Sequence, residues 1–259
     1  MLTGACSMDA GIVLVTATDM EMRAVMQGLE LDGPAPERGE SVTRRVRDIP
    51  VRLVCSGIGP LAAAFSIGRL AGEGMFPGHC RGLLSLGIAG TYASHAAPIG
   101  SVVVADAEIW PEYGLLTEQG VDPVALGFPL AGKKDDVAPP PVWDRVALSP
   151  ASAFAAMGLA NPATLPRMAE KPVVVTGASI TVAAVSGTRA RAEELATQYA
   201  ALTENMEGFP LALACARMAI PFAEIRSVSN FVGDRRPEAW NIPAALTALS
   251  CAAGMVFSG

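Results

Sequence analysis

Val-Arg-Leu-Val-Cys-Ser-Gly-Ile-Gly-Pro, residues 51–60, contains a strand, a glycine turn and the start of a helix in one short segment. Residues 51–55 are almost entirely apolar, which is typical of a strand buried on both faces. Pro60 suits the first turn of a helix, because its missing N–H would have no partner there. The segment therefore predicts a strand followed directly by a helix, the repeating unit of α/β folds.

The same pattern recurs along the chain. Buried strands are predicted at residues 11–16, 82–88, 101–105 and 172–176. Helices are predicted at residues 19–29, 189–200, 208–218 and 244–257. Thr188 is a suitable N-cap for the second of these. Strands that alternate with helices predict an α/β fold with three αβα layers and a mixed, mostly parallel central sheet.

Two segments interrupt this pattern. Residues 31–50 are charged and contain two prolines, which indicates a loop or a hairpin rim. Residues 120–170 are rich in proline and are predicted to form an irregular insertion, of the kind that often covers a site. No linker divides the chain, so we expect a single domain over residues 8–259 and an upstream extension over residues 1–7.

Composition excludes several classes of protein. Charged residues make up 17% of the chain and the net charge is -6, so a nucleic-acid-binding face is not expected. No apolar run of membrane-spanning length was found, and the cytoplasm is the expected location. The five cysteines are dispersed without CxxC spacing and there are only two histidines. We therefore expect neither a metal nor an organic cofactor, and chemistry carried by carboxylates and amides.

The turn in residues 57–62 also fits the GxGxxA dinucleotide fingerprint. It follows the second predicted strand and not the first. The nearest downstream carboxylate, Glu73, belongs to the same predicted helix. A tight structural turn is therefore favoured over NAD binding.

Three polar side chains follow predicted strands. Glu21 comes shortly after the first strand, Glu207 stands between Met206 and Gly208, and Asn230 closes Arg-Ser-Val-Ser-Asn. Each has an ordinary structural alternative: a first-turn helix acid, a capping acid and a satisfied strand-end amide. Ligands of open α/β sheets bind at the carboxyl ends of the strands. Together the three supply a base for water, a clamp for ribose hydroxyls and support for a leaving base, which suits N-glycosidic bond hydrolysis.

Six motifs give the chain a family resemblance over nearly its whole length. They are TATDMEMRAV (16–25), SGIGP (56–60), LGIAG (86–90), SITVAAVSGT (179–188), ENMEG (204–208) and RSVSNFVGDRRPEAWNIPAAL (226–246). They resemble the nucleoside phosphorylase/nucleosidase superfamily, and within it the futalosine hydrolases of menaquinone biosynthesis most of all. The resemblance implies a nucleoside phosphorylase-like fold, a small-molecule nucleoside substrate and a homodimer or higher oligomer whose neighbouring subunit helps to close the site.

The resemblance also implies residue roles. Glu21 matches the acid that activates water, Glu207 the acid that holds the ribose 2′ and 3′ hydroxyls, and Met206 the residue that packs on the sugar. Asn230 matches the position that handles purine N7 and the 6-substituent. The remaining matches border the ribose or contact the purine, the last three mainly through backbone groups: Gly87, Ile88, Ala89, Ile180, Thr181 and Val182.

Asn230 is where the chain departs from the similar methylthioadenosine/adenosylhomocysteine nucleosidases, which carry Asp there. A carboxylate suits a 6-aminopurine but repels the O6 acceptor of a 6-oxopurine. An amide donates to O6 and accepts from protonated N7. Asn230 therefore predicts hypoxanthine as the leaving base, as in futalosine, and speaks against adenosine-type substrates.

Phosphorylases of the superfamily need cationic ligands for phosphate. Residues 83–87 contain no arginine, and Arg23 is either a phosphate ligand or a solvated helix residue. Water is therefore the favoured nucleophile. A methylthioadenosine-type nucleosidase, a purine nucleoside phosphorylase and a non-catalytic nucleoside-binding protein remain as alternatives, and residues 110–145 match no motif that would identify the 5′ substituent.

Overall fold

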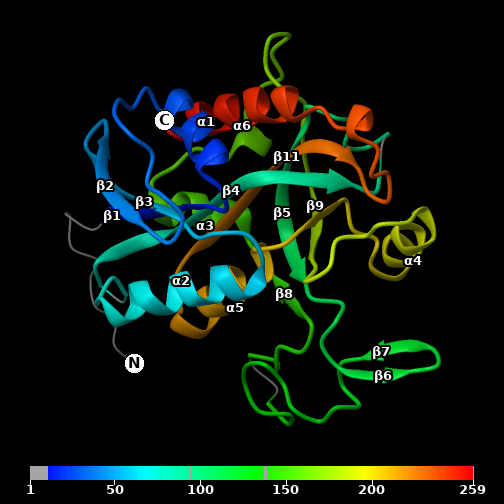
Figure 1. The fold of residues 1–259 in the computed structure, drawn as a ribbon. Helices are drawn as coiled ribbons and strands as arrows, with labels where there is room; N and C mark the ends of the chain where they lie inside the picture. The colour runs from blue at the N-terminus through cyan, green and yellow to red at the C-terminus, as the bar shows by residue number, and fades with distance from the viewer. Residues whose placement is uncertain (1–10, 77, 94, 137–138, 259) are drawn as a thin grey trace.

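The structure, a computed structural model, describes residues 11–76, 78–93, 95–136 and 139–258. A mixed central sheet lies between helices on both of its faces (Figure 1), so the predicted three-layer α/β fold is confirmed. The predicted extension over residues 1–7 lies outside the described residues.

The central sheet is built from strands of very different length. Its order is β10-β9-β5-β11-β4-β1-β3-β2, and β8 pairs with β5. The strands are β1 (Gly11–Thr16), β2 (Ser41–Val46), β3 (Ile49–Cys55), β4 (Cys80–Thr91), β5 (Val102–Ile109), β8 (Arg145–Ala147), β9 (Val174–Thr181), β10 (Thr203–Asn205) and β11 (Phe222–Phe231). Strand β10 pairs in parallel with β9 and antiparallel with β4. These pairings close five strands into a ring. Its members are β4, β11, β5, β9 and β10.

Helices cover both faces of the sheet. One face carries α1 (Asp19–Gly28), α3 (Pro150–Met157) and α6 (Ile242–Val256), whose buried side chains share one apolar core. The opposite face carries α2 (Pro60–Gly72) and α5 (Gly208–Met218), which form a second core. Figure 1 shows α1 with α6 above the sheet and α2 with α5 below it. Helix α4 (Arg189–Tyr199) lies beyond the end of the sheet that carries β9 and β10.

The start of α4 follows the sequence prediction closely. The Thr188 hydroxyl accepts a hydrogen bond from the backbone N–H of Arg191, which confirms the predicted N-cap. Pro60 likewise occupies the first turn of α2. Residues 31–50 contain β2, which pairs antiparallel with β3 in a hairpin, in agreement with the predicted rim.

Residues 120–170 are more ordered than predicted. They contain β8 and the helix α3, whose Phe154 and Met157 are fully buried in the core. The Pro-rich composition hid this helix, because Pro150 occupies its first turn and a short apolar spacing gives a weak periodic signal. Away from the core, the short strands β6 (Leu115–Thr117) and β7 (Gly120–Asp122) form a projecting hairpin (Figure 1). A short 3-10 turn, η1 (Pro162–Thr164), follows α3.

One helical stretch is longer and more apolar than the sequence analysis expected. The segment Pro237–Val256, which joins the 3-10 turn η2 (Pro237–Ala239) to α6, has the length and composition of a membrane span. Within it, α6 buries Ala245, Leu249 and Ala252 completely against the sheet and α1. The segment is therefore weak evidence for a membrane span, since the core helix of a globular domain has the same character.

Candidate active site

A pocket of about 350 Å³ opens at the carboxyl ends of β1, β4, β10 and β11. Six of the residues predicted from the sequence line it: Glu21, Ile88, Ala89, Met206, Glu207 and Asn230. These residues come from distant parts of the chain and converge because parallel strands end at the same edge of the sheet. The two carboxylates and the amide thus share one cavity of nucleoside-binding size.

Glu21 is both a first-turn helix acid and a residue of the pocket, the two alternatives that the sequence left open. Its Oε2 accepts hydrogen bonds from the backbone N–H and the hydroxyl of Thr18, which completes a capping box at the start of α1. Its Oε1 accepts from the backbone N–H of Ile88 at 2.9 Å, and the carboxylate lines the pocket. Because three donors hold it, the carboxylate presents a fixed acceptor lone pair to a ligand.

Glu207 is held from two sides. Its Oε1 accepts a 2.9 Å hydrogen bond from the backbone N–H of Gly59, and its Oε2 lies 3.6 Å from Nη1 of Arg226. Burial raises the pKa of Glu207, while the Arg226 charge and the Gly59 N–H act against that rise. The glycine turn is therefore structural, as predicted, but it also positions a site carboxylate. Gly59 has a φ of 97°, a conformation that suits glycine.

A buried polar network lies behind Glu207. Arg226 donates to Glu224 at 2.6 Å, and both side chains are almost wholly buried. Glu108 also belongs to this network, and burial together with the Glu224 charge holds the pKa of Glu108 well above its usual range. Asn205 donates to Glu108 at 2.8 Å and ties the network to β10.

Asn230 has a defined amide orientation. Its Nδ2 donates to the backbone carbonyl of Phe231 at 3.1 Å, and its Oδ1 accepts from the Ser229 hydroxyl at 2.8 Å. A carbonyl oxygen only accepts, so the amide nitrogen must face Phe231. A Cβ at Gly90 would lie 3.2 Å from Nδ2 of Asn230, and glycine at that position leaves the amide its room.

The structure adds site residues to which the sequence analysis assigned no role. Glu204 and Ser186 line the pocket. Arg226 lies behind Glu207 and forms an ion pair with it. The signal for Arg226 was present, because it is a charged residue inside the apolar strand β11. Glu204 gave a weaker signal, since its position in the pocket depends on the antiparallel pairing of β10 with β4.

Four predicted residues are not among the pocket's lining residues. Gly87 lies just beneath it, where a Cβ would meet Arg226 at 2.4 Å and Glu21 at 3.0 Å. Ile180, Thr181 and Val182 are buried around the end of β9. The hydroxyl of Thr181 donates to Glu108, and the backbone N–H of Val182 donates to the Asn205 carbonyl.

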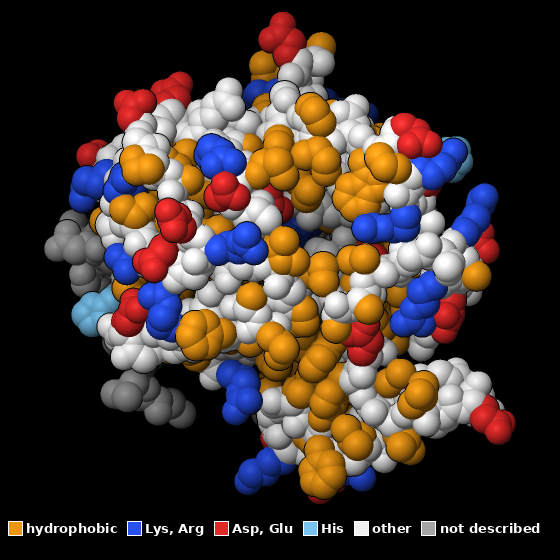
Figure 2. Space-filling view, in the orientation of Figure 1, with side chains coloured by type: hydrophobic (Ala, Val, Ile, Leu, Met, Phe, Trp, Pro, Cys, Tyr) orange, Lys and Arg blue, Asp and Glu red, His pale blue; other side chains and the backbone are white. Residues whose placement is uncertain are grey.

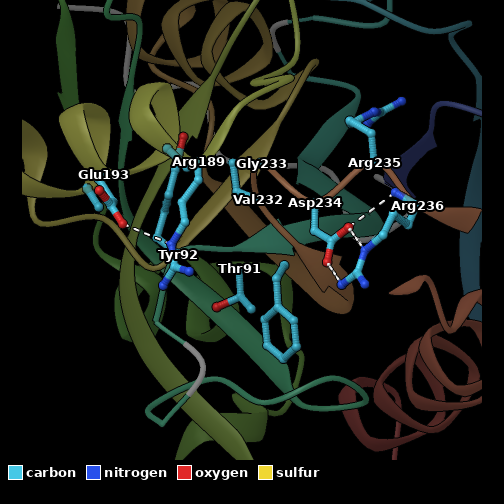
Figure 3. A pocket seen from close by; sticks show the side chains of 12 residues that line it. Thr91, Tyr92, Arg189, Glu193, Val232, Gly233, Asp234, Arg235 and Arg236 are labelled. Carbon is cyan, nitrogen blue, oxygen red and sulfur yellow. Dashed lines mark hydrogen bonds and ion pairs between the residues drawn. The ribbon is translucent and has the colours of Figure 1, made fainter. Parts of the chain in front are cut away.

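A larger cavity of about 890 Å³ adjoins the pocket and shares Val232, Gly233 and Arg235 with it. Figure 3 shows Arg189 paired with Glu193, and Asp234 paired with Arg236, on its walls. The Arg235 guanidinium lies 4.9 Å from the centre of the Trp240 ring. The smaller pocket is the candidate active site, because Glu21, Glu207 and Asn230 all face it.

The described residues contain no cluster of three or more His, Cys, Asp or Glu side chains arranged to hold a metal. Arg23, one alternative phosphate ligand, is exposed and pairs with Asp19 at 2.7 Å. It does not line the pocket, which supports its interpretation as a solvated helix residue.

This fold and this site place the protein among the nucleoside-processing α/β enzymes. The chain belongs to the phosphorylase superfamily, whose family model matches residues 11–256. Within that superfamily it groups with the futalosine hydrolases. It is 35% identical to futalosine hydrolase of Streptomyces coelicolor over 94% of this chain and 93% of that one. It is 32% identical to futalosine hydrolase of Acidothermus cellulolyticus over 92% and 86%.

Solved structures show the same fold. The native futalosine hydrolase of Helicobacter pylori matches with a TM-score of 0.67 at 16% identity, over 95% of each chain. The 5′-methylthioadenosine/S-adenosylhomocysteine nucleosidase of Helicobacter pylori, with butyl-thio-DADMe-Immucillin-A, matches with a TM-score of 0.70 at 16% identity, over 96% of this chain and 98% of that one. The resemblance inferred from the motifs is therefore confirmed.

Proposed function

We propose that this protein hydrolyses the N-glycosidic bond of futalosine and releases hypoxanthine and dehypoxanthine futalosine in menaquinone biosynthesis. The observation that carries this proposal is the convergence of Glu21, Glu207 and Asn230 in one pocket of a chain that groups with the futalosine hydrolases. The predicted cytoplasmic location belongs to the same proposal.

The reaction follows from the chemistry of these side chains. Glu207 accepts hydrogen bonds from the ribose 2′ and 3′ hydroxyls, and Met206 packs on the sugar. Glu21 takes a proton from a water molecule whose oxygen attacks the anomeric carbon. The bond from that carbon to N9 breaks through an oxocarbenium-like sugar, and its electron pair leaves with the base. The departing base takes a proton at N7 from solvent, and Glu21 returns the proton it took from water to solvent, so the overall step consumes one water molecule. Oδ1 of Asn230 then accepts from N7–H while Nδ2 donates to O6.

Water is the proposed nucleophile. Among the described residues, Arg235 is the cationic side chain that lines the pocket, and it lies over Trp240. Arg226 is turned toward Glu224 and Glu207, which already match its charge. A phosphate dianion in this pocket would lie among the carboxylates of Glu21, Glu204 and Glu207 with Arg235 as the available cation, whereas a neutral water molecule needs only the carboxylate of Glu21.

The oligomeric state belongs to the proposal as well. Met20 and Ile58 line the mouth of the pocket and are exposed. Exposed apolar side chains also lie on α2. Others lie on the arm, the projecting segment of residues 115–128 that contains the β6–β7 hairpin, which Figure 2 shows at the lower edge of the molecule. A second copy that covers these surfaces would close the pocket mouth. The exposed apolar residues are Leu61 and Phe65 on α2, and Leu115, Leu116, Val124, Leu126 and Phe128 on the arm.

The test is product analysis with futalosine, inosine and methylthioadenosine, each with and without phosphate. We expect hypoxanthine from futalosine at a rate that phosphate does not change. Release that requires phosphate would identify a phosphorylase, and adenine release from methylthioadenosine in preference to futalosine would identify the other class of nucleosidase. Binding of hypoxanthine nucleosides without product would identify a non-catalytic binder.

A further inference from the structure

A third carboxylate, Glu204, lines the pocket together with Asn230. Glu204 of β10 and Asn230 of β11 are both paired with Gly90 of β4, which lies between them in the sheet. Residues that are directly opposite in a sheet project from the same face. Both side chains line the pocket, and both are nearly buried. A planar base above Gly90 therefore has the amide on one side and the carboxylate on the other.

Three donors hold the Glu204 carboxylate. Its Oε2 accepts from the hydroxyls of Tyr92, at 2.6 Å, and Ser186, at 2.5 Å, and its Oε1 accepts from the backbone N–H of Ser186 at 2.9 Å. An ionised carboxylate offers about four lone-pair positions, so Oε1 retains one for a ligand. In this state the group can only accept a hydrogen bond.

The two purine classes differ at N1. In a 6-oxopurine such as hypoxanthine, N1 carries a hydrogen and donates. In adenine, N1 is an acceptor and would face a negative charge. Sites built to hydrogen-bond one pattern strongly reject the other, because a mismatch leaves buried polar groups unpaired. Glu204 therefore complements the same base that Asn230 favours.

We propose that Glu204 is a second specificity-determining residue, which accepts a hydrogen bond from N1–H of the 6-oxopurine, and that Tyr92 and Ser186 are its positioning residues. The inference rests on the proposed function and deepens it. The alternative is a purely structural role, here called a tether, in which Glu204 only holds Ser186 against β10 through hydrogen bonds and contacts no base. The two interpretations differ in one respect: a tether affects both base classes alike.

The test is the Glu204→Gln variant, which keeps the shape of the side chain and removes its charge. Equilibrium binding of hypoxanthine and of adenine is measured for the parent and the variant, together with kcat/KM for futalosine and its 6-amino counterpart. We expect the preference for the 6-oxo compound to fall on the order of 10- to 100-fold in both measurements, as for the loss of a hydrogen bond to a charged group. Tyr92→Phe removes one donor to Glu204 and keeps the carboxylate, so as a change at a positioning residue it should lower the preference by a smaller factor. Glu193→Gln, at an exposed carboxylate of the adjoining cavity, is the matched control and should keep the parental preference.

An unchanged preference in Glu204→Gln, with both base classes weakened equally, would overturn the inference in favour of the tether. If the variant does not fold, the binding of 1-methylhypoxanthine to the parent decides the question. Its N1 cannot donate, so binding as tight as that of hypoxanthine would also overturn the inference. Failure of the proposed function has a separate signature, because the parent itself would then release no hypoxanthine from futalosine.

Discussion

The two ends of the pocket are built differently. At the sugar end, Glu21 is held by Thr18 and by the backbone N–H of Ile88 in β4, and Glu207 by the backbone N–H of Gly59. Arg226 supports Glu207 from a buried network of charges. At the base end, Asn230 and Glu204 are oriented by hydroxyls and by single backbone contacts. In the proposed mechanism the sugar end therefore carries the charge that reacts, and the base end carries the pattern of donors and acceptors that selects.

This difference separates rate from selectivity. In the proposed mechanism every purine ribonucleoside presents the same ribose to Glu207 and the same anomeric carbon to Glu21, so changes at the sugar end should affect all these substrates in common. The 6-substituent and N1 differ between purines, so changes at the base end should alter the ratio between substrates. The following substitutions test that separation.

The largest effect is expected for Glu21→Gln. A positioned general base contributes about 10²–10⁴-fold to a rate, so turnover should fall by that factor for every substrate. The amide keeps the shape of the side chain, and a stability measurement by circular dichroism checks that the capping box survives. Arg23→Ala on the exposed face of the same helix is the control and should keep parental turnover. Near-parental turnover in Glu21→Gln would remove Glu21 from the mechanism.

Arg226→Met should cost about 3–5 kcal/mol of stability, because it leaves buried carboxylates without their cation. Urea denaturation measures this cost. Adding Glu224→Leu to the same chain removes one of the stranded charges and should recover part of the loss. A single Arg226→Met variant as stable as the parent would show that the network is not what holds Glu207.

Asn230→Asp should change selectivity more than rate. The carboxylate repels O6 of a 6-oxopurine and accepts from a 6-amino group, so kcat/KM should fall for futalosine and rise for its 6-amino counterpart. The expected change in their ratio is on the order of 10- to 100-fold, which corresponds to one hydrogen bond of a charged group. A variant that prefers futalosine as strongly as the parent does would contradict the role of Asn230.

The smallest expected effect is in the pH profile of kcat/KM, whose acid limb should lie at a higher pH than an ordinary glutamic acid would give. Burial raises the pKa of Glu207, so this carboxyl gains its proton at a higher pH than an ordinary glutamic acid. Once protonated it no longer accepts from both ribose hydroxyls, and kcat/KM should fall as the pH drops through that raised pKa. The limb should lie above the usual range of about 4.3, and Glu207→Gln should change its position. A limb at the ordinary value in the parent would contradict the assignment.

Local sequence patterns were sufficient to predict the main layers of the fold and six of the residues that line the pocket. Asn230 and Glu207 were predictable because a polar residue that ends a buried strand must lie at the sheet edge where ligands bind. The helix α3 was not, because its prolines and short length hid its buried face. The proximity of Glu204 to Asn230 was not predictable either, since it depends on the antiparallel pairing of β10 with β4.

The glycine turn of residues 57–60 is a second case in which a local pattern predicted the backbone but not its long-range contact. Its sequence predicted a tight turn, and the turn is present. Its hydrogen bond from Gly59 to Glu207 joins residues 148 positions apart, which no local pattern reports. Sequence alone thus predicted which groups carry the chemistry, while the structure was needed to show what holds them.

The most direct test of the whole account is the ratio of kcat/KM for futalosine to that for its 6-amino counterpart, measured on the parent protein in phosphate-free buffer. The account predicts rapid hypoxanthine release from futalosine and a ratio far above one, since Asn230 and Glu204 both complement a 6-oxopurine. Equal rates for the two compounds, or no release until phosphate is added, would contradict it.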